Sequence, residues 1–155
     1  MMLEDINIMN IRNMEEKDIN SVAILLNDYR IFYNKSNELA SCEQFLKDRF
    51  DNDDSQIFVA ELDDEVVGFA QIYPTFSTVS LQRAYILNDI FVSEKARNTG
   101  AGRKLIEKSF EYAEENNARY ICLETGKDNV KAQKLYEKMG MTIDETVYHY
   151  SKMIS

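Results

Sequence analysis

The chain has 155 residues, of which 45% are apolar and 29% are charged, and its formal net charge is −9. This length and composition predict one globular domain over residues 1–155 with a substantial buried core. The negative charge argues against a nucleic-acid binder that works through its global field. No apolar run approaches the length of a membrane span, and the acidic start MMLEDINIMN is unlike a signal peptide. We therefore expect no membrane partner and a cytoplasmic location.

The apolar residues alternate in some segments and recur every three or four residues in others, which distinguishes strands from helices. Ile19, Val22 and Leu26, for example, have helical spacing. In chain order the pattern predicts a strand over 6–12, helices over 15–33 and 41–50, strands over 57–62, 66–73 and 84–92, a helix over 103–116, a strand over 119–124, a helix over 129–139, and one or two final strands within 141–154. This order predicts a mixed α/β fold with a single sheet.

A loop with two glycines follows the strand that ends at Val92 and leads into the helix over 103–116. Glycine lets backbone N–H groups approach a phosphate closely, and the start of a helix adds partial positive charge. The loop has neither the Gly-Lys-Ser/Thr ending of a Walker loop nor the third glycine of the Rossmann fingerprint. An anion-binding loop is one interpretation, and a purely structural turn is the other.

The charges are unevenly distributed along the chain. Residues 95–138 hold 10 Lys and Arg against 7 Asp and Glu, whereas the remainder holds 8 against 20. A basic segment within an acidic protein would suit an anionic cofactor bound beside a cationic substrate, although ordinary solvated charge explains it equally well. The two cysteines, Cys42 and Cys122, fit neither a CxxC pair nor a Cys/His metal site, so no metal is expected.

Two motifs resemble those of GNAT acetyltransferases. Arg97-x-x-Gly100-x-Gly102, placed after a strand, resembles the family's pyrophosphate-binding motif Gln/Arg-x-x-Gly-x-Gly/Ala, and Asn129-x-x-Ala132-x-x-x-Tyr136-x-x-x-Gly140 resembles its second signature. The predicted element order also resembles the GNAT order over essentially the whole chain. The resemblance implies a GNAT fold, with one mixed, mostly antiparallel central sheet of six to seven strands flanked by about four helices.

The resemblance implies a transferase that uses acetyl-CoA as its co-substrate, and a homodimer, which is common in the family. The implied cofactor-binding residues are Ile90, Phe91, Val92, Arg97, Asn98, Thr99, Gly100, Ala101, Gly102, Arg103, Asn129 and Tyr136. Backbone groups of 90–92 would pair with the pantetheine amides as a missing strand would. Asn98 stands where Gly is commonest and Ala101 where Ile or Val is usual, but both should leave the backbone donors available.

Tyr136 is the implied catalytic acid, which would protonate the leaving thiolate. A tyrosine titrates near ~10 and a free thiol near ~8.5, so this transfer requires the hydroxyl to be placed at the sulfur. Asn129, seven residues earlier, would bond the pantetheine arm from the same helix face. Because Tyr136 also belongs to an apolar stripe, a role as a packing residue is the alternative.

Two further segments resemble the polyamine branch of the family, the spermidine/spermine and thialysine acetyltransferases. They are Val67-Gly68-Phe69-Ala70-Gln71-Ile72-Tyr73 and Leu87-Asn88-Asp89-Ile90-Phe91-Val92. Asn88 replaces a Glu of that branch, which weakens the implied preference for polycations. The implied acceptor is a primary amine of a small cationic molecule, such as a polyamine, a diamine or an amino-acid derivative. Acetylation of a protein lysine or N-terminus, and a non-catalytic acyl-CoA-binding module, are the alternatives.

Asp89 is the residue implied to meet the amine. An alkyl ammonium titrates near ~10.4 and must lose a proton before it attacks, so Asp89 would bind it and lead that proton away. The alternative is a strand carboxylate that pairs with Arg83 or caps a turn. Asn88, Tyr29 and Tyr33 are the other candidate substrate contacts, although packing within a helix face would also explain the two tyrosines.

Overall fold

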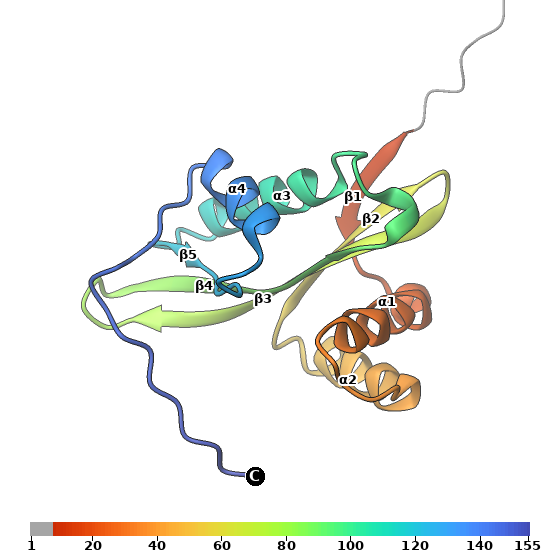
Figure 1. Cartoon of the computed structure of the whole chain (residues 1–155), viewed down its shortest axis with the longest axis horizontal. Coiled ribbons are helices and arrows are strands. Elements are labelled where there is room, and N and C mark those ends of the chain that lie inside the picture. Colours follow the sequence, from red (N-terminus) through yellow and green to blue (C-terminus); the bar gives the residue numbers. More distant parts are fainter. Residues whose placement is uncertain (1–7) are drawn as a thin grey trace, which may run out of the picture. The chain divides into compact units, whose positions relative to one another are not determined.

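The computed structural model describes residues 8–155, which form four α-helices and one five-stranded sheet (Figure 1). The elements are β1 (Met9–Asn13), α1 (Ile19–Phe32), α2 (Leu39–Asn52), β2 (Gln56–Leu62), β3 (Glu65–Ser77), β4 (Gln82–Val92), α3 (Ala101–Glu115), β5 (Ile121–Cys122) and α4 (Val130–Lys138), with short 3-10 turns η1 (Glu16–Asp18) and η2 (Glu94–Ala96). The mixed α and β fold is confirmed. Residues 6 and 7 of the predicted first strand lie outside the described residues.

Contacts divide the chain into two compact units, Met1–Glu124 and Thr125–Ser155. The first contains the whole sheet with α1, α2 and α3, and the second contains α4 and the end of the chain. A single domain over the chain stays a prediction. Within residues 8–155, no helix has the length and apolar character needed to cross a membrane.

The sheet follows chain order, β1-β2-β3-β4-β5. The first four strands are antiparallel neighbours, and β5 runs parallel to β4. The β2–β3 hairpin turns at Asp63 and Asp64, whose φ angles of 50° and 63° lie in the left-handed region that Asp tolerates better than most residues. The predicted hairpin is therefore present, and the sheet is mixed but mostly antiparallel.

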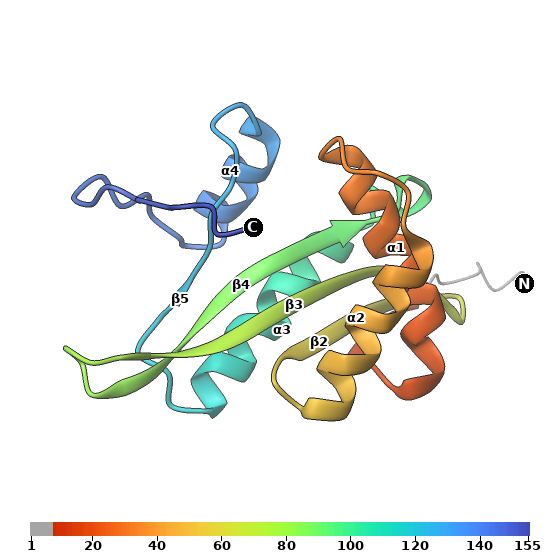
Figure 2. The ribbon, with the colours of Figure 1, turned by 90° about the horizontal axis from the view of Figure 1, so that it is seen from below.

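The two faces of the sheet are covered by different helices, α3 on one face and α1 with α2 on the other (Figures 1 and 2). On the α3 face, the rings of Phe58 and Tyr112 lie 5.7 Å apart. On the opposite face, Tyr29 of α1 packs against Phe69 and Phe91, with ring centroids 6.5 and 5.7 Å apart. Because successive side chains of a strand point to opposite faces, these contacts assign a face to each residue of β3 and β4.

Residues 141–154 form no strand, so the expectation of six to seven strands is wrong for the described chain. A strand needs a neighbouring edge to pair its N–H and C=O groups, and no described strand pairs with this segment. Its apolar side chains are consequently exposed, with Ile143 at 79%, Tyr148 at 90% and Ile154 at 88%.

Candidate active site

The loop between β4 and α3 contains two left-handed residues. Asn98 has φ 64° and Gly100 has φ 85°. Gly adopts this conformation without steric cost, and Asn is among the residues that tolerate it best. The hydroxyl of Thr99 donates to the carbonyl of Ala96, and the Lys104 N–H donates to the Gly100 carbonyl at 3.0 Å. The backbone path explains why Asn98 can stand where Gly is usual.

The start of α3 has free backbone donors. Gly100 is the residue that precedes the helix, and no side chain caps this end. The N–H groups of the first turn, at Ala101, Gly102 and Arg103, have no partner one turn earlier, and the helix dipole adds positive charge there. A Cβ added to Gly100 would meet no atom within 4 Å, so its surroundings are open.

Two cations lie in or beside this loop without an acidic partner. Neither Arg97 nor Lys104 forms an ion pair with another described residue, and both are exposed. Arg103 differs, because its Nε lies 3.1 Å from Glu107 Oε1. The loop therefore offers backbone donors and uncompensated positive charge at one place, which are the properties of a phosphate-binding site.

The β5 side of β4 is largely unpaired. The parallel pairing covers only Tyr85 with Ile121 and Ile86 with Cys122. From Leu87 to Val92, β4 pairs with β3 on one side and with no described strand on the other. The free edge includes the predicted residues Ile90, Phe91 and Val92. Such an edge can accept an extended chain of amide groups as an additional strand.

A β-bulge lies at Asn88. Asp89 is paired with Gln71 and Leu87 with Ile72, so Asn88 is an extra residue in β4. In an unbroken strand, Leu87 and Asp89 would point to the same face. The bulge instead places Leu87 with Ile72 on the α3 face and Asp89 with Gln71 on the face of α1 and α2. The polar side chain is thereby turned away from the core beneath α3.

Asp89 has no cationic partner among the described residues. Burial raises the pKa of its carboxyl, and a hydrogen bond from Asn88 Nδ2 to Asp89 Oδ2, 3.0 Å long, opposes that rise. Arg83 does not pair with it, because the Arg83 guanidinium lies over the Phe76 ring, 5.0 Å from its centroid. The alternative role of Asp89 as the partner of Arg83 is therefore wrong. A desolvated carboxylate without a cationic partner is suited to receive a cation.

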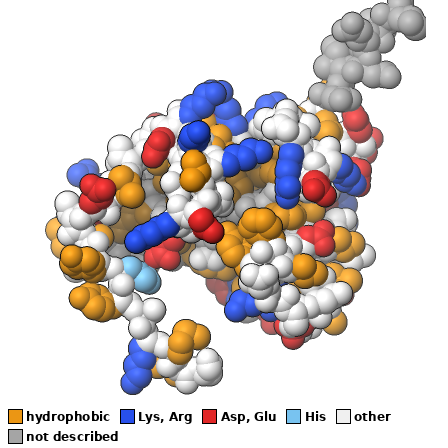
Figure 3. All heavy atoms as spheres, viewed as in Figure 1, with side chains coloured by type: hydrophobic (Ala, Val, Ile, Leu, Met, Phe, Trp, Pro, Cys, Tyr) orange, Lys and Arg blue, Asp and Glu red, His pale blue; other side chains and the backbone are white. Residues whose placement is uncertain are grey.

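Tyr29 and Tyr33 lie on the same side of the sheet as Asp89. The two rings meet edge to face at 5.0 Å. Tyr29 rests on the sheet, as the packing interpretation predicts, while Tyr33 is 47% exposed. Figure 3 shows hydrophobic side chains at the surface of the region formed by α1 and α2. Phe32 of α1 and Phe45 of α2 are exposed apolar residues of these helices. An apolar surface thus lies next to the α1 end that carries Tyr33.

The second signature lies in the unit Thr125–Ser155. Asn129 precedes α4 instead of lying within it, and its Oδ1 accepts the Ala132 N–H at 3.3 Å. The Tyr136 carbonyl accepts the Met141 N–H at 3.0 Å, and Gly140 has φ 92°. Gly140 therefore ends the helix, as predicted. Tyr136 is in the last turn of α4 and half-buried, and its role as the acid stays a prediction.

Comparison with known proteins decides the family. Residues 22–141 match the acetyltransferase (GNAT) family. The chain belongs to the GNAT acetyltransferases. It is 45% identical over 142 residues to the uncharacterized N-acetyltransferase YhfO of Bacillus subtilis (strain 168), covering 92% of this chain and 95% of that protein. Like other members, this GNAT enzyme is an N-acetyltransferase that depends on acetyl-CoA.

Two further relatives of the GNAT enzyme are informative. A solved structure of a probable acetyltransferase superposes with a TM-score of 0.89 at 35% identity, covering 94% of this chain and 98% of that one. The D-amino-acid N-acetyltransferase HPA3 of Saccharomyces cerevisiae is 32% identical over 84 residues, which are 54% of this chain and 52% of that protein. The polyamine branch itself is not distinguished from other GNAT members by these matches.

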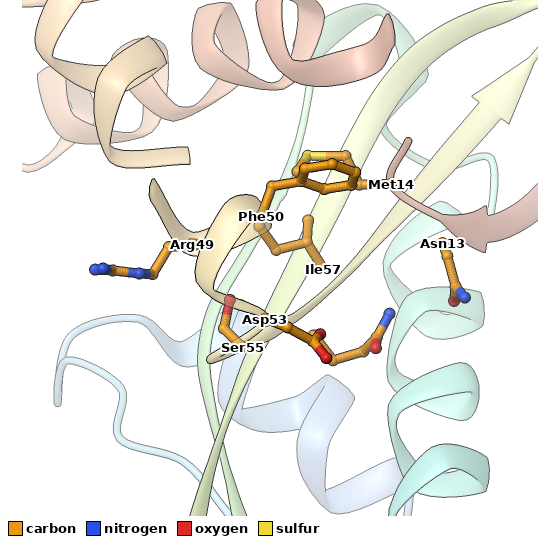
Figure 4. A pocket seen from close by; sticks show the side chains of 8 residues that line it. Asn13, Met14, Arg49, Phe50, Asp53, Ser55 and Ile57 are labelled. Atoms are coloured by element: carbon orange, nitrogen blue, oxygen red, sulfur yellow. The ribbon is translucent and has the colours of Figure 1, made fainter. Parts of the chain in front are cut away.

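Two neighbours of Asp89 in the GNAT enzyme were not predicted as site residues from the sequence. Gln71 and Tyr73 alternate along β3, so both share the face of Asp89. The paired polar residues Asn88-Asp89, which break the strand alternation, were the available signal of the bulge that brings them together. A pocket of about 280 Å³ at the end of α2 contains none of the predicted site residues (Figure 4); it is lined by Asn13, Met14, Arg49, Phe50, Asp53, Ser55, Gln56 and Ile57.

Proposed function

We propose that this GNAT enzyme acetylates the primary amine of a small cationic acceptor, such as a polyamine, a diamine or an amino-acid derivative. The amine would attack the thioester directly, in a ternary complex with acetyl-CoA. The observation that carries this proposal is the half-buried Asp89 carboxylate, which has no cationic partner and lies on the strand with the free edge. A cationic amine would supply the missing charge.

The donor side is assigned to the loop and to the edge of β4. Acetyl-CoA supplies an acetyl group activated as a thioester. The free N–H groups at the start of α3, with Arg97, Asn98 and Thr99 before them, would hold its pyrophosphate. The edge of β4 from Ile90 to Val92 would hold the pantetheine amides. Asn129 would bond the same arm, and Tyr136 would return a proton to the thiolate sulfur.

The acceptor side is assigned to Asp89, Asn88, Tyr29 and Tyr33. Because burial raises the Asp89 pKa, this carboxylate is a stronger base than an exposed one. It can therefore bind an ammonium and also help to remove its proton, directly or through water. The exposed Tyr33 and its apolar neighbours would contact the carbon chain of the acceptor.

An acceptor screen tests the proposal. Thiol release from acetyl-CoA would be measured with spermidine, 1,5-diaminopentane, L- and D-lysine, a lysine peptide and a neutral amino acid. The relation to a D-amino-acid acetyltransferase supports including both enantiomers. We expect thiol release with the small cationic amines and little release with the lysine peptide or the neutral amino acid. A dominant response to the peptide would favour a protein acetyltransferase, and no release with any amine would favour a non-catalytic acyl-CoA-binding module.

Asp89→Asn should raise KM for the cationic amine, lower kcat, or both, with little effect on the affinity for acetyl-CoA. It should also make the salt dependence of kcat/KM shallower, since screening acts on the charge that is removed. The Asp89 pKa is raised in the folded state, so the ionised carboxylate costs stability above that pKa, and the amide variant should melt at the same or a higher temperature at neutral pH. Rates across a salt series and melting curves give both quantities.

Asp64→Asn is the matched control for that experiment. It removes the same charge at the exposed β2–β3 turn, where Asn tolerates the left-handed φ of 63°. The control should retain the wild-type KM. If Asp89→Asn and Asp64→Asn respond alike to salt, and neutral amines are acetylated better than cations, the cationic acceptor is ruled out while the enzyme class stands.

A further inference from the structure

Gln71 is a buried polar residue whose amide is incompletely satisfied. Its side chain is 1% exposed, between Ile57 of β2 and Asp89 of β4 in the register of the sheet. The amide nitrogen Nε2 has no hydrogen-bond partner among the described residues. Buried polar groups are nearly always paired, and an unpaired one destabilises the fold. A methionine would fill this volume without that cost, so stability alone does not explain a glutamine here.

The neighbours of Gln71 indicate what the amide does. Tyr73 lies two residues along β3 and therefore on the same face, next to Asp89. Burial, and then the charge of Asp89, raise the pKa of the Tyr73 hydroxyl, while its approach to the Gln71 side chain lowers that pKa. Arg49 and Asp54 also act on this hydroxyl, in opposite directions. Tyr73 thus stays protonated at neutral pH, with an oxygen that can accept a hydrogen bond.

The bulge at Asn88 creates this group of side chains. In a regular strand with Asn88 paired, Asp89 would share the α3 face with Leu87, away from Gln71 and Tyr73. With the bulge, a carboxylate, a phenol and an amide share one face of the sheet. Directly paired and diagonal positions on one face are within reach of long side chains, so the three groups can act on one bound ammonium.

We propose that Gln71 is a positioning residue, which orients the Tyr73 hydroxyl toward Asp89 so that both oxygens hold the ammonium of the acceptor. The inference rests on the proposed transfer to an amine. In this arrangement Asp89 provides the charge and Tyr73 a second hydrogen-bond acceptor, which together favour a primary ammonium with several N–H groups over a more substituted one. Gln71 itself is too deeply buried to contact the acceptor and acts through Tyr73.

A double-mutant cycle tests this arrangement. Gln71→Met, Tyr73→Phe and the double variant would be assayed for kcat and KM with spermidine, 1,5-diaminopentane and lysine. Each single variant should lower kcat/KM by about 10- to 100-fold, as expected for the loss of one hydrogen bond to a charged group, mainly through KM for the amine. Because Gln71 acts through Tyr73, the double variant should be no worse than Tyr73→Phe alone.

Three controls separate positioning from packing. Gln71→Met should melt at the same or a higher temperature than the wild type, because it removes an unpaired buried amide, and KM for acetyl-CoA should not change. Gln82→Met makes the same change at an exposed end of β4 and should have no effect. Gln71→Glu places a second carboxyl opposite Asp89 and should move the acid limb of the kcat/KM profile to higher pH, since two close carboxyls resist joint ionisation.

The possible outcomes distinguish the role proposed for Gln71 from the proposed class of acceptor. If the losses in kcat/KM of the two single variants multiply in the double variant, Gln71 does not act through Tyr73. If Gln71→Met melts at a lower temperature with an unchanged KM for the amine, Gln71 only packs. Either result would overturn the inference and leave acetyl transfer intact. Absence of thiol release by the wild-type enzyme with all three amines would instead overturn the proposed acceptor class, and this inference with it.

Discussion

Replacing Tyr136 by phenylalanine should lower kcat by about 10²–10⁴-fold, the range expected for losing a positioned general acid. The ring, and with it the packing of α4, is kept, and only the hydroxyl is removed. If that hydroxyl protonates the thiolate sulfur, the loss should fall on turnover and leave the affinity for acetyl-CoA nearly unchanged. Single-turnover rates and the melting shift with acetyl-CoA would measure the two effects separately.

Tyr148→Phe provides the matched control. It removes the same hydroxyl within residues 125–155, from a side chain that is 90% exposed, and it should keep the wild-type turnover. If Tyr136→Phe keeps the wild-type turnover under conditions in which chemistry limits the rate, Tyr136 is only a packing residue of α4. The acid would then have to come from another group, or the thiolate would leave unprotonated.

Gly102→Glu should abolish the stabilisation by acetyl-CoA. Gly102 lies in the first turn of α3, where the N–H groups have no intrahelical partner. A glutamate there would add bulk and like charge where the pyrophosphate is expected. At 100 times its Kd, a ligand stabilises a protein by about 2.7 kcal/mol, so the wild-type melting temperature should rise measurably and that of the variant should not.

The same variant should fold normally, which makes the loss interpretable. A glutamate in the first turn of a helix interacts favourably with the dipole, so the melting temperature without ligand should be equal or higher. Ala40→Glu, in the first turn of α2, is the control that adds the same charge elsewhere on the protein. Equal shifts with acetyl-CoA in wild type and Gly102→Glu would remove the phosphate-binding role from this loop.

The sequence was most informative where local chemistry decides the structure. The helix over 103–116, the hairpin at Asp63 and Asp64, and the end of α4 at Gly140 are set by apolar spacing and by residues that tolerate a left-handed φ. The loop from Arg97 to Gly102 could be placed at the start of α3 for the same reason. None of these features depends on a distant part of the chain.

The features that were missed depend on pairing between distant segments. The bulge exists only in the register of β3 against β4, so the sequence alone did not place Gln71 opposite Asp89. Residues 141–154 have the composition of strands, but a strand forms only beside an available edge. The alternative in which Asp89 pairs with Arg83 is wrong for a similar reason. The Arg83 guanidinium lies over the ring of Phe76, which is its neighbour only because β3 and β4 pair.

The bulge at Asn88 also determines which genetic changes the site can survive. Loss of the Asn88 codon would leave Leu87 and Asp89 adjacent and still opposite Ile72 and Gln71, so the strand would become regular and the side chains on either side would keep their faces. Loss of Ile90, in contrast, would bring Phe91 opposite Ala70 and turn its ring to the α3 face. Descendants of this gene should therefore diverge in length at Asn88 more readily than at the paired positions that follow it in β4.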